Sequence, residues 1–275
     1  MKLLREWVLY IFMAALGSIY LAPLVLMFVY SLMPLTQIGQ FPPNYIPEEF
    51  QWINYISALK FWNFYVGFKN TMLITILTII GNVLSSSFVA YGFARFEFPG
   101  RNILFSILLG TMMLPFAVTM VPLFLGYNYL GMINTFFPLV LPHYFGVAFF
   151  IFLLRQFYLS IPKDYLDAAR IDGASEITIW WRIMIPLSKP AILVVIILSF
   201  QHAWDDFIQP LIYLQDENLQ TLSLGLYRFR ALPGQGSIVN EMMAASVMLT
   251  VPQILVFLFF QKQILDGANL SGVKG

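Results

Sequence analysis

The sequence predicts an all-α integral membrane protein with six transmembrane helices and both termini in the cytoplasm. Three observations predict this class: the composition, the spacing of the apolar segments, and the distribution of Lys and Arg. Hydrophobic residues make up 59% of the 275 residues and charged residues 11%, whereas an average soluble domain carries roughly 25% charged residues. The chain is long enough for several spans of about 20 residues, but not for a sizeable soluble domain besides.

Long apolar segments recur along the chain, each near the length that a helix needs to cross the hydrocarbon layer. A helix is preferred because an open strand edge in lipid leaves its backbone groups unpaired. The six segments are 8–33, 70–94, 103–125, 137–158, 189–213 and 242–262. Prolines within them predict bends or local breaks at Pro23, Pro115, Pro122, Pro138, Pro142 and Pro210.

The first segment has two interpretations. Lys2 and Arg5 precede an apolar core, and Ala15-Leu16-Gly17 resembles a cleavage site, as in a secretory signal. The apolar run continues through Leu32, however, which is long enough to span the membrane. We therefore expect an uncleaved first span, and whether it is ever processed stays open.

The Lys and Arg residues predict the orientation. With the N-terminus inside, eleven of the 15 lie on the inner side and four on the outer side, as cytoplasmic loops of membrane proteins require. The outer loop 34–69 is rich in aromatic residues, which fits either an interfacial belt or a docking surface for an external protein. The loop 214–240 contains Gly234 and Gly236, and we expect it to be flexible.

Residues 160–190, here termed the charged loop, form the one long polar stretch in the second half of the chain. Local signals predict two short helices around a turn: Pro162 near the start of the first helix, Gly173 in a left-handed conformation at its end, and Ser175 as the cap of the second helix. The second helix should stop before Pro186. The charged residues of the loop are Lys163, Asp164, Asp167, Arg170, Asp172, Glu176, Arg182 and Lys189.

Two functions fit these local features. The small side chains of Ala168 and Ala169 allow another protein surface to approach the backbone closely, so that the first helix fits a groove in a soluble partner. Alternatively, the second helix lies on the bilayer with Trp180 and Trp181 as anchors.

The spacing within the charged loop resembles the EAA signature of binding-protein-dependent ABC importer permeases, E-A-A-x3-G-x9-I-x-L-P. Asp replaces the Glu of the signature and Ile185 replaces its Leu, and the gaps match without insertion. The resemblance implies the type I (MetI-like) importer fold, and a coupling helix that sits in a groove of a cytoplasmic ATPase. The ATPase-coupling residues that it implies are Asp167, Ala168, Ala169, Gly173, Ile183 and Pro186.

Further segments resemble the sugar-importing branch, in particular the smaller permease of maltose-type or glycerol-phosphate-type systems. They are Asn70-Thr71, the run from Ala90 to Phe96, the run from Ile171 to Ser175, and Gly272-Val273-Lys274-Gly275. The resemblance implies one permease domain over 1–275 with a core over 66–262. His143-Tyr144 departs from the family pattern, in which small residues are expected there.

The resemblance also implies the partners and the location. They are a second, homologous permease in a heterodimer, a cytoplasmic ATPase dimer, an extracellular or periplasmic solute-binding protein, and the lipids of a prokaryotic cytoplasmic (inner) membrane. We expect no nucleic-acid partner. The solute would be a sugar, an oligosaccharide or a glycerol-phosphate-like compound, which the sequence does not name.

The chain contains no G-x-x-x-x-G-K-[ST] phosphate loop, so it does not bind ATP as a motor of its own. ATP and Mg²⁺ would belong to the partner ATPase. With two histidines on different predicted spans and no cysteine, we expect neither a cofactor, a metal site nor an enzyme activity in this chain.

Polar residues within the fifth segment predict a solute path. Ionisable groups at membrane depth are costly and usually line a bundle interior or a watery path. Carboxylate and amide groups bond sugar hydroxyls, and Trp204 could offer a stacking face. The residues are Gln201, His202, Trp204, Asp205 and Asp206. Alternatively they pair with the second permease, or the two aspartates already lie at the outer surface. An ion-coupled secondary transporter would use His202 and the aspartates as a proton relay.

Overall fold

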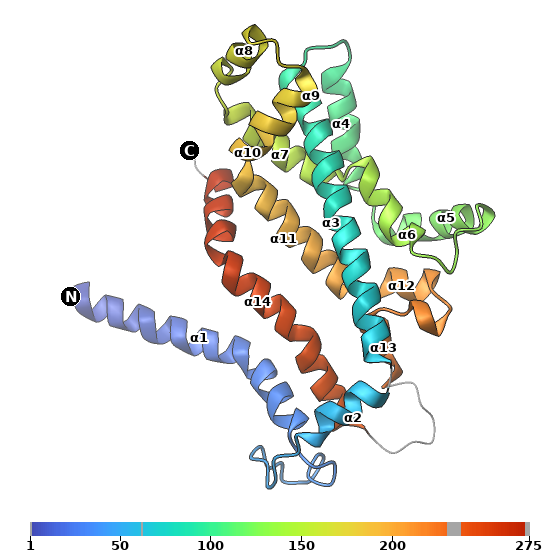
Figure 1. The fold of residues 1–275 in the computed structure, drawn as a ribbon. Helices are drawn as coiled ribbons and strands as arrows, with labels where there is room; N and C mark the ends of the chain where they lie inside the picture. The colour runs from blue at the N-terminus through green and yellow to red at the C-terminus, as the bar shows by residue number, and fades with distance from the viewer. Residues whose placement is uncertain (1, 62, 230–237, 273–275) are drawn as a thin grey trace. The chain divides into compact units, whose positions relative to one another are not determined.

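The computed structural model describes the backbone of residues 2–61, 63–229 and 238–272, and the side chains of the same residues except 2–5, 228 and 263–272. The described residues form helices and no strand (Figure 1). The α-helices are α1 (Lys2–Ser31), α2 (Ile53–Phe61), α3 (Phe64–Arg95), α4 (Arg101–Thr111), α5 (Phe116–Tyr129), α6 (Phe137–Val140), α7 (Ala148–Ser160), α8 (Asp164–Ile171), α9 (Glu176–Ile179), α10 (Ile185–Leu187), α11 (Lys189–Asp205), α12 (Ile208–Tyr213), α13 (Leu222–Arg228) and α14 (Val239–Gly272). The expected flexible residues Gly234 and Gly236 and the C-terminal segment 273–275 lie outside the described residues.

Four stretches are long and apolar enough to cross a membrane: Glu6–Ser31, Phe64–Arg95, Phe137–Ser160 and Val239–Lys262. Two bent pairs raise the candidates to as many as six within the described residues. In one pair α4 and α5 meet at 96°, and in the other the segment Glu176–Leu187 meets α11 at 83°. The all-helical class is thus confirmed, with four to six candidate spans.

The prolines of the apolar segments differ in their effect on the helices. Pro115 directly precedes α5 at the 96° bend, as predicted. Pro138 lies in the first turn of α6 and Pro142 in that of the 3₁₀ turn Leu141–Phe145, where the missing N–H is not needed. Pro23 and Pro122 lie inside α1 and α5, which continue through them.

The chain forms two compact units, of which the first comprises residues 1–65 and 224–254. Here the loop 34–52 folds back on the end of α1. The buried Asn54 side chain donates to the carbonyl oxygens of Ser31 at 3.0 Å and Met33 at 3.1 Å, and its Oδ1 accepts from Asn240 Nδ2 at 3.0 Å. One buried amide therefore satisfies backbone groups that the end of a helix leaves free.

The second unit comprises residues 66–223 and 255–275 and holds the charged loop. Its core joins α3, α7, α8 and α11 through side chains such as Ala90, Leu154, Leu166 and Val195, all of them 0–1% exposed. Small residues on the buried face of α3 let neighbouring helices approach closely. Arg95 donates to the carbonyl oxygens of Tyr158 and Ile161, so that the end of α3 holds the chain that leaves α7.

Candidate functional site

The turn of the charged loop has the predicted local structure. Gly173 has φ +80° and follows α8, a conformation that costs a side-chain-bearing residue about 1–2 kcal/mol. Ser175 precedes α9, and its Oγ accepts from the backbone N–H of Thr178 at 3.3 Å. The predictions for Gly173 and Ser175 are both confirmed.

The limits of the two helices differ from the prediction. The helix α8 begins at Asp164, two residues after Pro162. The second helix does not stop before Pro186, because a π-helical turn, Trp180–Met184, leads into α10, and Pro186 lies in the first turn of α10. The irregular π-helical turn lies directly before Pro186, the residue whose N–H is missing from this continuous helical stretch. The chain then bends by 83° into α11.

Charged side chains join the parts of the loop to each other and to α3. Arg170 Nη1 donates to Asp167 Oδ1 at 3.0 Å, and Arg170 Nε donates to Glu176 Oε1 at 2.8 Å. Tyr91 on α3 donates its hydroxyl to Glu176 Oε2 at 2.5 Å. The hydrogen bond to Glu176 is the main cause that raises the pKa of the Arg170 guanidinium, so Arg170 stays charged and links α8 with α9.

The two alanines of the EAA-like motif lie on different faces of α8. Ala169 is buried with Leu166 and Ile179 in the core of this chain, whereas Ala168 is exposed. Ile171 beside it is 87% exposed. Ala168 is therefore accessible to a partner, while Ala169 holds α8 in place. Of the other motif residues, Asp167, Gly173 and Pro186 are exposed and Ile183 is half-buried.

Four of the five predicted path residues are accessible on or after α11. Gln201, His202 and Asp205 are exposed, and Asp206 is half-buried. Trp204, by contrast, is 2% exposed.

The prediction of a stacking face at Trp204 is wrong. Its ring stacks on Phe200 with centroids 5.3 Å apart and meets Phe68 edge-on at 6.2 Å. Aromatic neighbours from this chain thus cover the ring.

A polar network that the sequence analysis missed connects α3, the 3₁₀ turn and α11. Asn82 Nδ2 donates to Ser199 Oγ at 2.9 Å, and Asn82 Oδ1 lies 3.0 Å from His143 Nδ1. The rings of His143 and His202 have centroids 6.3 Å apart. A buried amide inside an apolar segment is a signal of its own, but its partners lie 61 and 117 residues away along the chain.

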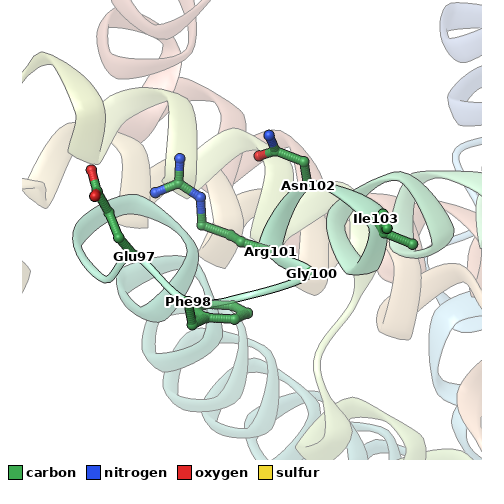
Figure 2. Close-up of a pocket in the computed structure, with 6 residues that line it drawn as sticks. All are labelled: Glu97, Phe98, Gly100, Arg101, Asn102 and Ile103. Carbon is green, nitrogen blue, oxygen red and sulfur yellow. The ribbon is translucent and has the colours of Figure 1, made fainter.

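A surface hollow of about 470 Å³ lies at the turn between α3 and α4 (Figure 2). Its lining residues are Glu97, Phe98, Gly100, Arg101, Asn102 and Ile103. All of them come from one turn and the start of one helix, and none was predicted as a site residue. The hollow therefore brings no distant groups together.

An all-helical fold with four to six candidate spans, and a structured charged loop between apolar helices, defines the class as a polytopic membrane protein. The sequence matches the family described as "binding-protein-dependent transport system inner membrane component" over residues 82–266, and the chain belongs to this family. The family predicted from the EAA-like spacing is confirmed.

Relatives and a solved structure agree with this membership. One relative is the arabinooligosaccharides transport system permease protein AraQ of Halalkalibacterium halodurans. The two sequences are 33% identical, and the alignment covers 98% of this chain and 97% of AraQ. The sn-glycerol-3-phosphate transport system permease protein UgpE of Yersinia enterocolitica is 30% identical over 90% of each chain. A bacterial ABC transporter involved in the import of the acidic polysaccharide alginate has the same fold, with a TM-score of 0.85, 24% identity, and coverage of 94% and 96%.

These findings identify a transport permease and give no support to an ion-coupled secondary transporter.

Proposed function

We propose that this chain is the permease subunit of an ATP-driven importer for a sugar, an oligosaccharide or a glycerol-phosphate-like solute. The observation that carries the proposal is the EAA-like spacing from Asp167 to Pro186, set on a helix whose Ala168 is exposed. The relatives above, named as arabinooligosaccharide and glycerol-phosphate permeases, support this class of solute.

The exposed face of α8 is the coupling surface in this proposal. Tyr165, Ala168 and Ile171 project from it and would enter a groove of a separate ATPase, which binds ATP and Mg²⁺. Leu166 and Ala169 pass the movement to the core of the second unit. The coupling residues are Asp167, Ala168, Gly173, Ile183 and Pro186, with Ala169 supporting them from inside.

The proposed topology has six spans and both termini in the cytoplasm. In it α4 and α5 together form the third span and α11 forms the fifth, because 17 residues reach the lower limit for crossing the hydrocarbon. The charged loop then lies on the inner side with most of the Lys and Arg residues. The complex would include a second, homologous permease, an ATPase dimer and a solute-binding protein on the outer side. The family description, which names a binding-protein-dependent transport system, supports the last of these.

The solute path in this proposal is lined by Gln201, His202, Asp205 and Asp206. All four lie on or directly after α11 and are exposed or half-buried. Asp206 Oδ1 accepts from the backbone N–H of Gln209 at 3.2 Å, which fixes the carboxylate where α11 ends.

The test uses two substitutions in the charged loop of the complete transporter in proteoliposomes. Ala168→Arg puts a long cation on the docking face, and Gly173→Leu forces a side chain into the left-handed conformation, although space around it is open. We expect ATP hydrolysis stimulated by the loaded binding protein to fall by about tenfold or more, as at an interface hot spot. Membrane insertion should be unchanged.

Matched controls separate docking from general damage. Asn102→Arg adds the same cation in the first turn of α4, and Gly173→Asn introduces a residue that tolerates the left-handed conformation. Both should keep hydrolysis near the wild-type rate. Normal stimulation in Ala168→Arg and Gly173→Leu would overturn the proposed coupling surface.

A further inference from the structure

His143 is fixed on α3 through both its backbone and its side chain. Its carbonyl oxygen lies 2.8 Å from Ser85 Oγ, whose one hydroxyl hydrogen is shared with the Gly81 carbonyl oxygen at 2.6 Å, and its Nδ1 lies 3.0 Å from Asn82 Oδ1. Gly81 lets this segment approach, since a Cβ there would lie 2.7 Å from the Tyr144 ring. The ring of His143 is therefore held in one position.

The orientation of the Asn82 amide decides which nitrogen of His143 carries the proton. Asn82 is 1% exposed and Ser199 is 0% exposed, and the amide N–H₂ of Asn82 already donates to Ser199 Oγ. The amide oxygen is left to face His143, and an amide oxygen only accepts hydrogen bonds. Nδ1 is then the donor, and Nε2 of the neutral ring carries a lone pair.

Nothing that the structure describes hydrogen-bonds to that Nε2. The ring of His143 is half-buried and meets the exposed His202 at 67°, beside Gln201 on the next position of α11. The His143 ring therefore lies beside His202, in the group of residues proposed to line the path, with one ring nitrogen that no described residue uses. A hydroxyl of a solute is the donor that fits it.

The surrounding charges favour a neutral solute over an anion. Asp205 and Asp206 follow His202 by three and four residues, whereas the nearest cations along α3, Lys69 and Arg95, are each 13 residues from Asn82. At 1.5 Å per residue this separation is about 20 Å. A phosphate would meet the Asp206 carboxylate and no nearby cation along α3, which is unfavourable.

We propose that His143 determines solute specificity: its Nε2 accepts a hydrogen bond from a hydroxyl of a neutral saccharide, while Asn82 and Ser199 hold the ring in the required tautomer. This inference rests on the proposed import function and narrows its solute class from sugars and glycerol phosphates to uncharged, hydroxyl-rich compounds.

The decisive variant is His143→Asn. The Asn amide N–H₂ takes the place of Nδ1 and keeps the bond to Asn82, but no atom replaces Nε2. His143→Gln is the matched control, since its amide reaches the position of Nε2. Each is tested in the complete transporter in proteoliposomes, with labelled neutral oligosaccharides of arabinose, glucose and N-acetylglucosamine, and with sn-glycerol 3-phosphate.

We expect the wild type to import a neutral saccharide with ATP, and His143→Asn to import it about three- to tenfold more slowly, the effect of one lost hydrogen bond. His143→Gln should be less affected, and co-purification of both variants with the second permease should be unchanged. Nitrogen NMR of the histidine-labelled transporter should show protonated Nδ1 and unprotonated Nε2 at His143.

The other outcomes distinguish the inference from the proposed function. Unchanged saccharide import by His143→Asn, loss of co-purification in that variant, or the opposite tautomer would overturn the role of His143 and leave the import function standing. If the wild type imported only sn-glycerol 3-phosphate, the inference of a neutral saccharide as the solute would be overturned, and the proposed import function would remain. ATP-dependent import of no probe by the wild type would overturn both.

Discussion

In the charged loop, Arg170 bonds Asp167 and Glu176 through side chains that are between 39% and 59% exposed, whereas Asn82 and Ser199 bond each other at 0–1% exposure. Exposed ion pairs are screened by water and are worth about 0–1 kcal/mol. A buried neutral donor that loses its partner costs about 1–3 kcal/mol. The helices are thus joined at the loop by weak contacts that can rearrange. Inside the bundle they are joined by hydrogen bonds whose loss destabilises the protein more.

The difference fits the work proposed for each region. A surface that follows an ATPase needs charged contacts that rearrange in water, with the position of α8 fixed by Leu166 and Ala169 beneath it. A residue that selects a solute needs one orientation, which the bonds from Asn82 and Ser85 give to His143. The two regions should therefore differ in how much stability the protein loses when one contact is removed.

The largest effect is expected from Asn82→Leu. Leu has a similar branched shape, although it is larger, but it bonds neither Ser199 nor His143, so both are left without this partner. We expect the free energy of unfolding to fall by about 2–3 kcal/mol, measured by SDS-induced unfolding of the purified protein followed by tryptophan fluorescence.

Thr78→Val, one turn away on α3, is the control. The Thr78 hydroxyl is buried and has no hydrogen-bond partner in the described part of the chain, so its removal should leave stability unchanged or slightly higher. Equal losses in the two variants would mean that burial, rather than the network, decides stability here.

The second effect is expected from Gly81→Ala, which tests whether the turn holding His143 is packed tightly. The added Cβ would lie 2.7 Å from the Tyr144 ring and 3.2 Å from the backbone carbon of His143. The ring is partly exposed and can move, but the backbone must shift as well. Overpacking of this kind costs about 1–3 kcal/mol, measured in the same unfolding assay.

The same substitution at Gly92 gives the opposite expectation. Nothing among the described atoms lies within 4 Å of a Cβ at Gly92, and Ala is favoured over Gly inside a helix by roughly 0.5–1 kcal/mol. Gly92→Ala should therefore raise stability. A loss as large as that of Gly81→Ala would show that α3 tolerates no added methyl group anywhere.

Features set by neighbouring residues could be predicted from the sequence. The apolar segments, the left-handed Gly173 and the Ser175 cap depend on local turn chemistry and on length, and the EAA-like spacing correctly indicated the family. The end of the second helix was missed because the π-helical turn before Pro186 changes where a proline is tolerated.

Features set by distant residues could not be predicted. Trp204 has the composition of a sugar-stacking residue, but Phe68, 136 positions earlier, covers its ring. Asn82 and His143 each look like an isolated polar residue in an apolar segment, and only the packing of α3 against the 3₁₀ turn joins them. The sequence predicts on which face of a helix a side chain lies, but not which distant residue packs against that side chain.

The smallest effect is expected from Arg170→Gln in the charged loop. It removes both ion pairs while keeping a long polar side chain, and the partners Asp167 and Glu176 stay in contact with water. We expect a loss below about 1 kcal/mol, and about 0.5 M salt should reduce it further because exposed charges are screened within a few ångströms. A double-mutant cycle with Glu176→Gln isolates the Arg170–Glu176 contribution. A loss above 2 kcal/mol that persists in salt would contradict the view that the exposed ion pairs of the loop are weak. It would mean that charge, rather than the packing of Leu166 and Ala169, holds α8 on the bundle.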